Sequence, residues 1–99
     1  MFVKLYRYKI KSADLDKCKK NADDVWKIYS SNCKLEYKLL IKKKVLESEI
    51  IELGFYRSKT DWLDVMRKLN KNRKLNLLFK EFLKIAINGE FEEEEFEAL

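Results

Sequence analysis

The chain has 99 residues, the length of one domain, and its 46% apolar and 13% aromatic content predicts a folded core rather than a disordered chain. It contains no histidine and two glycines, which excludes histidine-based nucleophile pairs, histidine haem ligation and glycine-rich phosphate loops. Since two cysteines without histidine cannot build the usual structural zinc sites, we expect no metal and no cofactor.

Targeting signals and membrane spans are also missing from the pattern. No apolar run approaches the roughly 20 residues that span a bilayer, and residues 1–10 lack the uninterrupted apolar core of a secretory signal. We therefore expect a soluble, cytoplasmic protein without membrane contact. In that compartment Cys18 and Cys33 are expected to be free thiols.

The first predicted elements are a strand and a helix. Residues 2–10 are rich in Phe, Val, Tyr and Ile, which is typical of a strand, and Lys4 is the polar exception on its apolar face. Ser12 or Asp14 offers a helix cap. The apolar stripe of that helix consists of Leu15, Cys18, Ala22, Val25, Trp26 and Tyr29.

Two further strands follow at hairpin distance. Residues 34–42 show the clearest alternation in the chain, with Leu35, Tyr37, Leu39 and Ile41 on one face. After three lysines, a third strand is predicted from Val45 to Tyr56. Gly54 within it indicates a bulge or a close approach of another group.

The second half of the chain is predicted to be helical up to Asn88-Gly89. Residues 58–61 resemble a capping box, followed by the apolar stripe Trp62, Val65, Met66 and Leu69. Residues 70–72 weaken the pattern before a second stripe resumes at Leu75, which indicates two consecutive helices or one interrupted helix. Residues 90–99 are compatible with a fourth strand or an acidic tail, and Phe91 and Phe96 cannot share a strand face.

This order of elements, β-α-β-β-α with a final β left open, is the split βαβ pattern of ferredoxin-like folds. We therefore predict a single α+β domain over residues 1–99, with an antiparallel sheet and helices on one face. The other face of the sheet must be covered by something else.

Three segments carry a resemblance to a known group: FVKLYRYKI, the hairpin through LEYKLLIKK and IIELGFY, and FYRSKTDW. In layout the chain resembles the dimeric α/β-barrel superfamily, the antibiotic-biosynthesis-monooxygenase-like group. The resemblance implies a homodimer with facing sheets and a pocket between sheet and helices. It implies activities that range from cofactor-independent oxidation of aromatic polyketides to haem degradation, but the missing histidine departs from the haem-degrading type.

The aromatic residues with polar tips are the candidates for a ligand pocket that holds a small, flat aromatic molecule. They are Tyr6, Tyr8, Trp26, Tyr37 and Trp62, together with Tyr29. The alternative is that they are core and dimer-interface residues, which their periodicity favours. Tyr6 and Tyr37 are also candidates to stabilise an oxyanion or to orient a phenol. No catalytic residue is identified.

Three carboxylates, Glu47, Glu49 and Glu52, lie on the third predicted strand. A carboxylate in an apolar pocket could be a general base. The pattern favours the alternative, in which they are solvated charges or pair across the strands with Lys38 and Lys42.

The charge is uneven, with a net of +8 over residues 1–46, +3 over 47–89 and −6 over 90–99. A basic body with interleaved aromatics is compatible with nucleic-acid binding, but the lysines are spread along the chain and no RNP-like motif is present, which disfavours it. The favoured function is a dimeric α/β-barrel protein with a small-molecule pocket, either a cofactor-independent monooxygenase-like enzyme or a ligand-binding relative. The alternatives are a module that binds nucleic acid or an acidic partner, and a structural or regulatory homodimer without catalysis.

Overall fold

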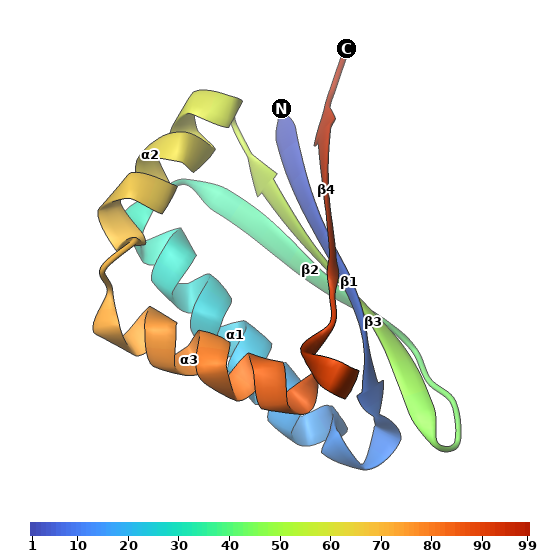
Figure 1. The fold of residues 1–99 in the computed structure, drawn as a ribbon. Coiled ribbons are helices and arrows are strands. Elements are labelled where there is room, and N and C mark those ends of the chain that lie inside the picture. Colours follow the sequence, from blue (N-terminus) through green and yellow to red (C-terminus); the bar gives the residue numbers. More distant parts are fainter.

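The computed structural model describes all 99 residues, which form four strands, three α-helices and two short 3-10 turns (Figure 1). In chain order these are β1 (Phe2–Lys11), η1 (Ser12–Asp14), α1 (Leu15–Asn32), β2 (Leu35–Lys42), β3 (Glu47–Tyr56), α2 (Lys59–Leu69), α3 (Arg73–Ile85), η2 (Ile87–Gly89) and β4 (Glu92–Glu97). None of the helices is long and apolar enough to cross a membrane.

The strands form one sheet in the order β2-β3-β1-β4, and every neighbouring pair is antiparallel. The three helices all lie on one face of this sheet, as Figure 1 shows, and the molecule is 19 Å thick along its shortest axis. That thickness fits one layer of helices on one sheet. The predicted α+β ferredoxin-like fold, with β1 and β2 on either side of β3, is confirmed.

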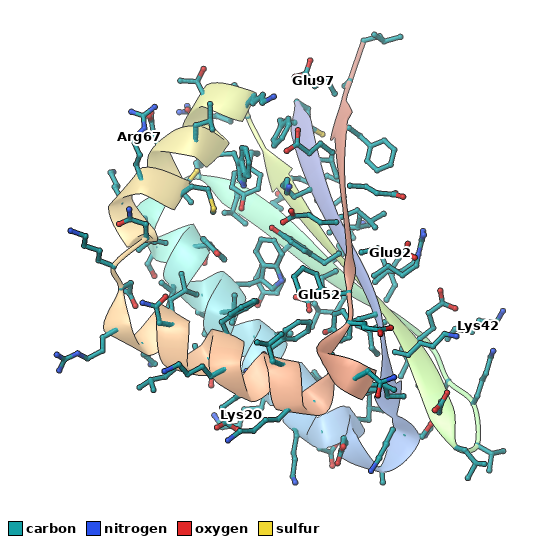
Figure 2. All side chains as sticks on the ribbon, viewed as in Figure 1. Lys20, Lys42, Glu52, Arg67, Glu92 and Glu97 are labelled. Carbon is teal, nitrogen blue, oxygen red and sulfur yellow. The ribbon has the colours of Figure 1, made fainter.

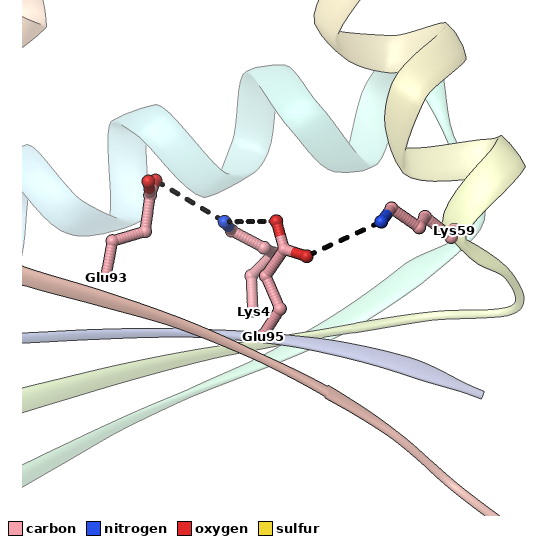
Figure 3. A network of polar contacts seen from close by, with 4 residues as sticks. All are labelled: Lys4, Lys59, Glu93 and Glu95. Atoms are coloured by element: carbon pink, nitrogen blue, oxygen red, sulfur yellow. Dashed lines mark hydrogen bonds and ion pairs between the residues drawn. The ribbon is translucent and has the colours of Figure 1, made fainter.

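The acidic C-terminal segment is a strand, which settles the question that the sequence left open. β4 pairs along β1, so that Glu93 and Glu95 lie on the helix side of the sheet beside Lys4. Lys4 Nζ lies 3.5 Å from Glu93 Oε1 and 3.3 Å from Glu95 Oε1, and Lys59 Nζ lies 3.7 Å from Glu95 Oε2 (Figure 3). Charge pairing across the strands therefore compensates for the weak apolar alternation of this segment.

The two phenylalanines of that segment lie on different sides, as their spacing of five predicts. Phe91 precedes β4 and packs against Phe79 and Phe82 of α3, with ring centroids 6.2 Å and 5.5 Å away. Phe96 is opposite Val3 on the face of the sheet that carries no helix. Phe91 thus closes the space between the sheet and α3.

The two C-terminal helices are separate because each has its own cap. The Asp61 backbone N–H donates to Ser58 Oγ at 3.2 Å, so Ser58 caps α2 as predicted, while the Asp61 carboxylate accepts from Arg57 Nε at 2.9 Å. The Leu75 backbone N–H donates to Asn72 Oδ1 at 2.8 Å and starts α3. The polar residues between the two apolar stripes therefore end one helix and begin the next.

Two local predictions need correction near the β2–β3 hairpin. Neither Ser12 nor Asp14 caps α1 through its side chain; instead Ser12 Oγ donates to the Lys44 carbonyl at 2.7 Å and ties η1 to the hairpin. The third strand begins at Glu47 rather than Val45. Val45 belongs to the turn and is exposed, so its β-branched side chain is not part of the sheet.

Candidate functional site

A cavity of about 500 Å³ lies between the sheet and the helices. Sixteen residues line it, eleven of them hydrophobic, and they come from β1, β3, β4, all three helices and the segment before β4. Its aromatic side chains are Tyr6, Trp26, Tyr29, Phe79, Phe82 and Phe91. The cavity is therefore where a ligand would meet the most aromatic surface in the molecule.

One buried carboxyl, that of Glu52, forms part of this wall. Glu52 is 8% exposed and lies on the central strand β3, between Tyr6 on β1 and Leu39 on β2. Figure 2 shows it between the helices and the sheet. The interpretation of the β3 carboxylates as solvated charges is therefore wrong for Glu52, because even-numbered positions of β3 face the helices.

The other two carboxylates of β3 lie on the opposite face. Glu49 is opposite Lys9 and Lys42 in the sheet register, and its Oε1 lies 3.8 Å from Arg7 Nε. Glu47 is opposite Lys11 and is exposed. Glu49 thus pairs with Arg7 of β1, and of the two lysines predicted as partners only Lys42 is opposite it, since Lys38 is opposite Leu53.

Both oxygens of the Glu52 carboxyl have partners. Trp26 Nε1–H donates to Oε1 at 2.7 Å, and Tyr8 Oη–H donates to Oε2 at 2.5 Å. Burial raises the pKa of Glu52, the two donors act in the opposite direction, and Asp23 adds to the rise. Desolvation therefore dominates, and Glu52 binds a proton more readily than a carboxyl in water.

The hydrogen bonds continue from Glu52 to a thiol. Tyr8 Oη lies 3.3 Å from Cys18 Sγ, and either atom can be the donor. When Glu52 is ionised, Tyr8 donates to it and accepts from Cys18; when Glu52 is protonated, it donates to Tyr8, which donates to Cys18. Both protonation states are thus satisfied without any movement of these side chains, so this carboxyl can accept or release a proton inside the cavity.

Two tyrosine hydroxyls near the cavity stay protonated. The pKa values of Tyr6 and Tyr29 are raised, first by burial and then by surrounding negative groups that include Glu93 and Glu52. Tyr6 is therefore a hydrogen-bond donor toward a ligand and is not a source of phenolate.

The structure separates the aromatic residues that the sequence proposed for the pocket. Tyr6 and Trp26 line the cavity, as does Tyr29. Tyr8 lies beside it, with its hydroxyl on Glu52 and its ring 4.7 Å edge-on from Phe82.

Tyr37 and Trp62 are not part of the cavity wall. Tyr37 stacks on Trp26 with ring centroids 5.6 Å apart, and Trp62 packs on Phe2 at 5.3 Å.

Several residues of the wall were not proposed from the sequence. Phe79 and Phe82 were recognised as an apolar helix stripe without a role beyond packing. Phe91 is flanked by glutamates in the sequence, and an isolated aromatic residue in an acidic segment was the available sign that it packs against the core. Asn21 is buried on α1, and its Nδ2 donates to the Leu78 carbonyl at 2.9 Å, which fixes α3 beside α1.

Comparisons with known proteins agree with this fold. No family model and no curated protein matches the sequence. An uncharacterised NIPSNAP domain protein from Burkholderia xenovorans is similar in structure, with a TM-score of 0.75, 11% identity and coverage of 100% of this chain and 95% of that one. A protein of the antibiotic biosynthesis monooxygenase type from Nitrosomonas europaea has a TM-score of 0.69 and 8% identity, covering 99% and 89%.

The cofactor-independent oxygenase SnoaB from Streptomyces nogalater, solved as a variant, is also similar, with a TM-score of 0.65, 11% identity and coverage of 98% and 91%. At these identities the similarity shows the fold alone. The chain therefore has the ferredoxin-like fold that antibiotic-biosynthesis-monooxygenase-like and NIPSNAP proteins share, and the resemblance seen in the sequence is confirmed at that level.

Proposed function

We propose that the chain binds a small, flat and largely apolar molecule in the cavity between its sheet and its helices. The observation that carries the proposal is the buried Glu52 carboxyl in the wall of an otherwise mostly hydrophobic cavity. Binding sites for small molecules combine apolar and aromatic walls with a few placed polar groups, in volumes of roughly 300–1,000 Å³. The cavity, at about 500 Å³, falls within that range.

Ligand binding can be measured with naphthylmethanol, a flat neutral probe, through the fluorescence of Trp26 in the wall. We expect saturable quenching in the wild type. Val25→Trp should abolish it, since Val25 lines the cavity from α1 and the larger ring would occupy it. Lys20→Trp adds the same ring on the solvent side of α1 and should leave binding unchanged. Equal binding by both variants would contradict the proposal.

Native mass spectrometry of freshly purified, untagged protein addresses the natural ligand. Extra mass that is retained by the wild type and lost in Val25→Trp would identify a molecule held in the cavity. Extra mass retained equally by both variants would place that molecule elsewhere.

A second candidate is cofactor-independent oxygenation of the bound aromatic molecule, as in the oxygenase of the same fold. Glu52 supports it, because a buried carboxyl with a raised pKa is a suitable base for a proton of the ligand. In the overall reaction a ligand CH₂ group and O₂ yield a C=O group and water. Glu52→Gln should remove oxygen uptake with an anthrone probe and retain its binding; uptake unchanged by that variant would exclude this role.

We also propose that the chain forms a homodimer through the face of the sheet that carries no helix. The apolar side chains on this face are Val3, Leu5, Leu40, Ile51, Leu53, Phe55 and Phe96. Leu40 and Phe96 are 49% and 50% exposed, and exposed apolar side chains gathered on one face are typical of an interface. Lys38, opposite Leu53, and Glu94, opposite Leu5, lie on the same face.

A second copy fits this face because its margin carries charges of both signs. Arg7, Lys9 and Lys42 lie there with Glu49 and Glu92, and a two-fold arrangement can pair opposite charges. A chain of this size also exposes a large share of its surface, so pairing contributes stability.

Sedimentation equilibrium tests the dimer. Leu53→Asp places a charge in the middle of this face, opposite Leu5, and should shift the protein to a monomer. Val45→Asp makes the same change in the exposed hairpin turn and should leave the dimer intact. A wild type that is monomeric at micromolar concentration would rule the dimer out.

A further inference from the structure

The charge of the cavity wall has one sign. Two ionisable acids, Glu52 and Glu93, line it, and no lysine or arginine does. The two carboxyls also lie near the same tyrosine, because both raise the pKa of Tyr29. The chain as a whole has more basic residues (22) than acidic ones (17), whereas the ionisable side chains of the cavity wall include acids and no basic residue.

The aromatic side chains of the wall reinforce that sign. The faces of aromatic rings carry negative electrostatic potential and attract cations. Six aromatic residues and two carboxyls therefore surround one space of about 500 Å³. An anion would find no basic side chain in the wall to pair with, because the nearby Lys4 is already paired with Glu93 and Glu95.

The protein already holds one ammonium group in similar surroundings. Lys4 Nζ lies 4.6 Å from the ring centroid of Trp62 and 5.7 Å from that of Tyr6, with Glu93 Oε1 at 3.5 Å. Tyr6 and Glu93 both belong to the cavity wall as well. Aromatic rings and a carboxylate thus stabilise the buried ammonium of Lys4. Two of these groups, Tyr6 and Glu93, would also contact a ligand in the cavity.

We propose that the ligand of the cavity is an organic cation, a flat aromatic molecule that carries an amine or a quaternary ammonium. This inference rests on the proposed function and names the chemical class of its ligand. The ring system occupies the aromatic part of the cavity, and the cationic group lies near Glu52. Anionic ligands such as carboxylates and phosphates are disfavoured, because no basic side chain lines the wall to pair with them.

Binding of a cation draws a proton out of the site. Glu52 gains a positive neighbour, so its proton is released and the carboxylate pairs with the ligand. Helices α2 and α3 contribute no titratable side chain to the wall. The titratable groups around Glu52 are Tyr6, Tyr8, Cys18, Asp23, Tyr29 and Glu93. Since Tyr6, Tyr8 and Cys18 have raised pKa values, Glu52 is the group expected to release the proton.

The test compares three probes with the same ring and different charge, by isothermal titration calorimetry: naphthylmethylamine, naphthylmethanol and naphthoate. The amine is expected to bind at least about tenfold more tightly than the alcohol at about pH 8, and naphthoate to bind least. The affinity for the amine should rise as the pH increases and Glu52 releases its proton, while that for the alcohol stays constant.

Matched variants assign the effect to the wall. Glu52→Gln should lose the preference for the amine over naphthylmethanol and the pH dependence of amine binding. Glu81→Gln removes a carboxylate from the exposed side of α3, outside the cavity wall and the proposed dimer face, and should behave as the wild type.

The outcomes separate this inference from the proposed function. If naphthylmethanol binds to the wild type and not to the Val25→Trp variant, but the amine binds no more tightly than the alcohol, the cavity is a ligand site and the inference of a cationic ligand is wrong. If none of the three probes binds, both proposals fail. Tighter binding of naphthoate than of naphthylmethylamine would overturn the inference that the ligand is a cation.

Discussion

The indole ring of Trp26 lies directly over the α-carbon of Gly54. A β-carbon added at Gly54 would be 2.5 Å from Trp26 Cη2 and 3.2 Å from Tyr56 Cε2. The register of β3 continues through Gly54 against both of its neighbours, so the glycine serves a close approach and not a bulge. The absence of a side chain there lets Trp26 reach Glu52 with its Nε1–H.

Gly54→Ala should therefore destabilise the fold, by about 1–3 kcal/mol, because Trp26 must move out of a packed position. Urea unfolding measures the change. In combination with Trp26→Phe, whose smaller ring relieves the overlap, the two losses should be less than additive. Strict additivity would show that the ring of Trp26 is not what the new methyl group meets.

The two tryptophans give a second contrast, because their N–H groups differ. Trp26 Nε1 donates to the buried Glu52, whereas Trp62 Nε1 is buried without a hydrogen-bond partner. Trp26→Phe should cost about 1–3 kcal/mol, since it removes volume and leaves a carboxyl oxygen unpaired. Trp62→Phe removes an N–H group that makes no hydrogen bond, so this variant should lose under about 1 kcal/mol of folding stability. Thermal unfolding compares them, and similar losses would speak against a role for the Trp26–Glu52 bond.

The order of elements was predictable because it depends on local periodicity, which the strands and the helix stripes display openly. The last strand was not, because its stability comes from pairing with β1 through Lys4 rather than from its own alternation. The boundary at Glu47 was missed for a related reason: Val45 and Leu46 look like strand residues, and only the turn explains their exposure.

The candidate site was harder to predict than the fold. Tyr6 and Trp26, which line the cavity, could be proposed because they are amphipathic aromatic residues. Periodicity predicts which face of a strand or helix a residue occupies, but it does not predict how far that residue lies from residues of other elements. The importance of Glu52 depends on which face of β3 the helices cover, and a strand with carboxylates on both faces does not reveal this. Phe91 enters the wall only because the chain turns at η2, where Asn88 and Gly89 have positive φ angles.

The pairing of Lys4 supplies a third prediction. Lys4 is 2% exposed, whereas its partners Glu93 and Glu95 are about half exposed. Lys4→Met removes the charge and keeps the length, and both carboxylates can be hydrated, so the loss should stay within about 1 kcal/mol. The double variant Glu93→Gln/Glu95→Gln leaves a buried ammonium without a counter-charge and should cost more, about 1–3 kcal/mol.

Urea unfolding at low and high salt measures both variants of this network. The double variant should be the less stable of the two at either salt concentration, because salt screens exposed charges more than buried ones. A larger loss for Lys4→Met would indicate that the methylene stem and the contact with Trp62, rather than the charge pairs, stabilise this part of the sheet.

The last prediction concerns the pH dependence of stability that Glu52 causes. Burial raises its pKa in the folded state above the unfolded value of about 4.3, so the folded chain holds this proton over a range where the unfolded chain has released it. The contribution of Glu52 to stability is therefore most favourable below the unfolded pKa, and it declines as the pH rises toward the folded pKa. Glu52→Gln has the shape of the protonated form and cannot ionise, so the variant should match the wild type within about 1 kcal/mol near pH 4 and become the more stable protein as the pH rises. Denaturant midpoints of the two proteins across this range, with Glu81→Gln on the exposed side of α3 as the control, give the difference directly. A difference between Glu52→Gln and the wild type that stays constant with pH would mean that folding does not raise the pKa of this carboxyl, and the neutral acid in the cavity would have to be abandoned.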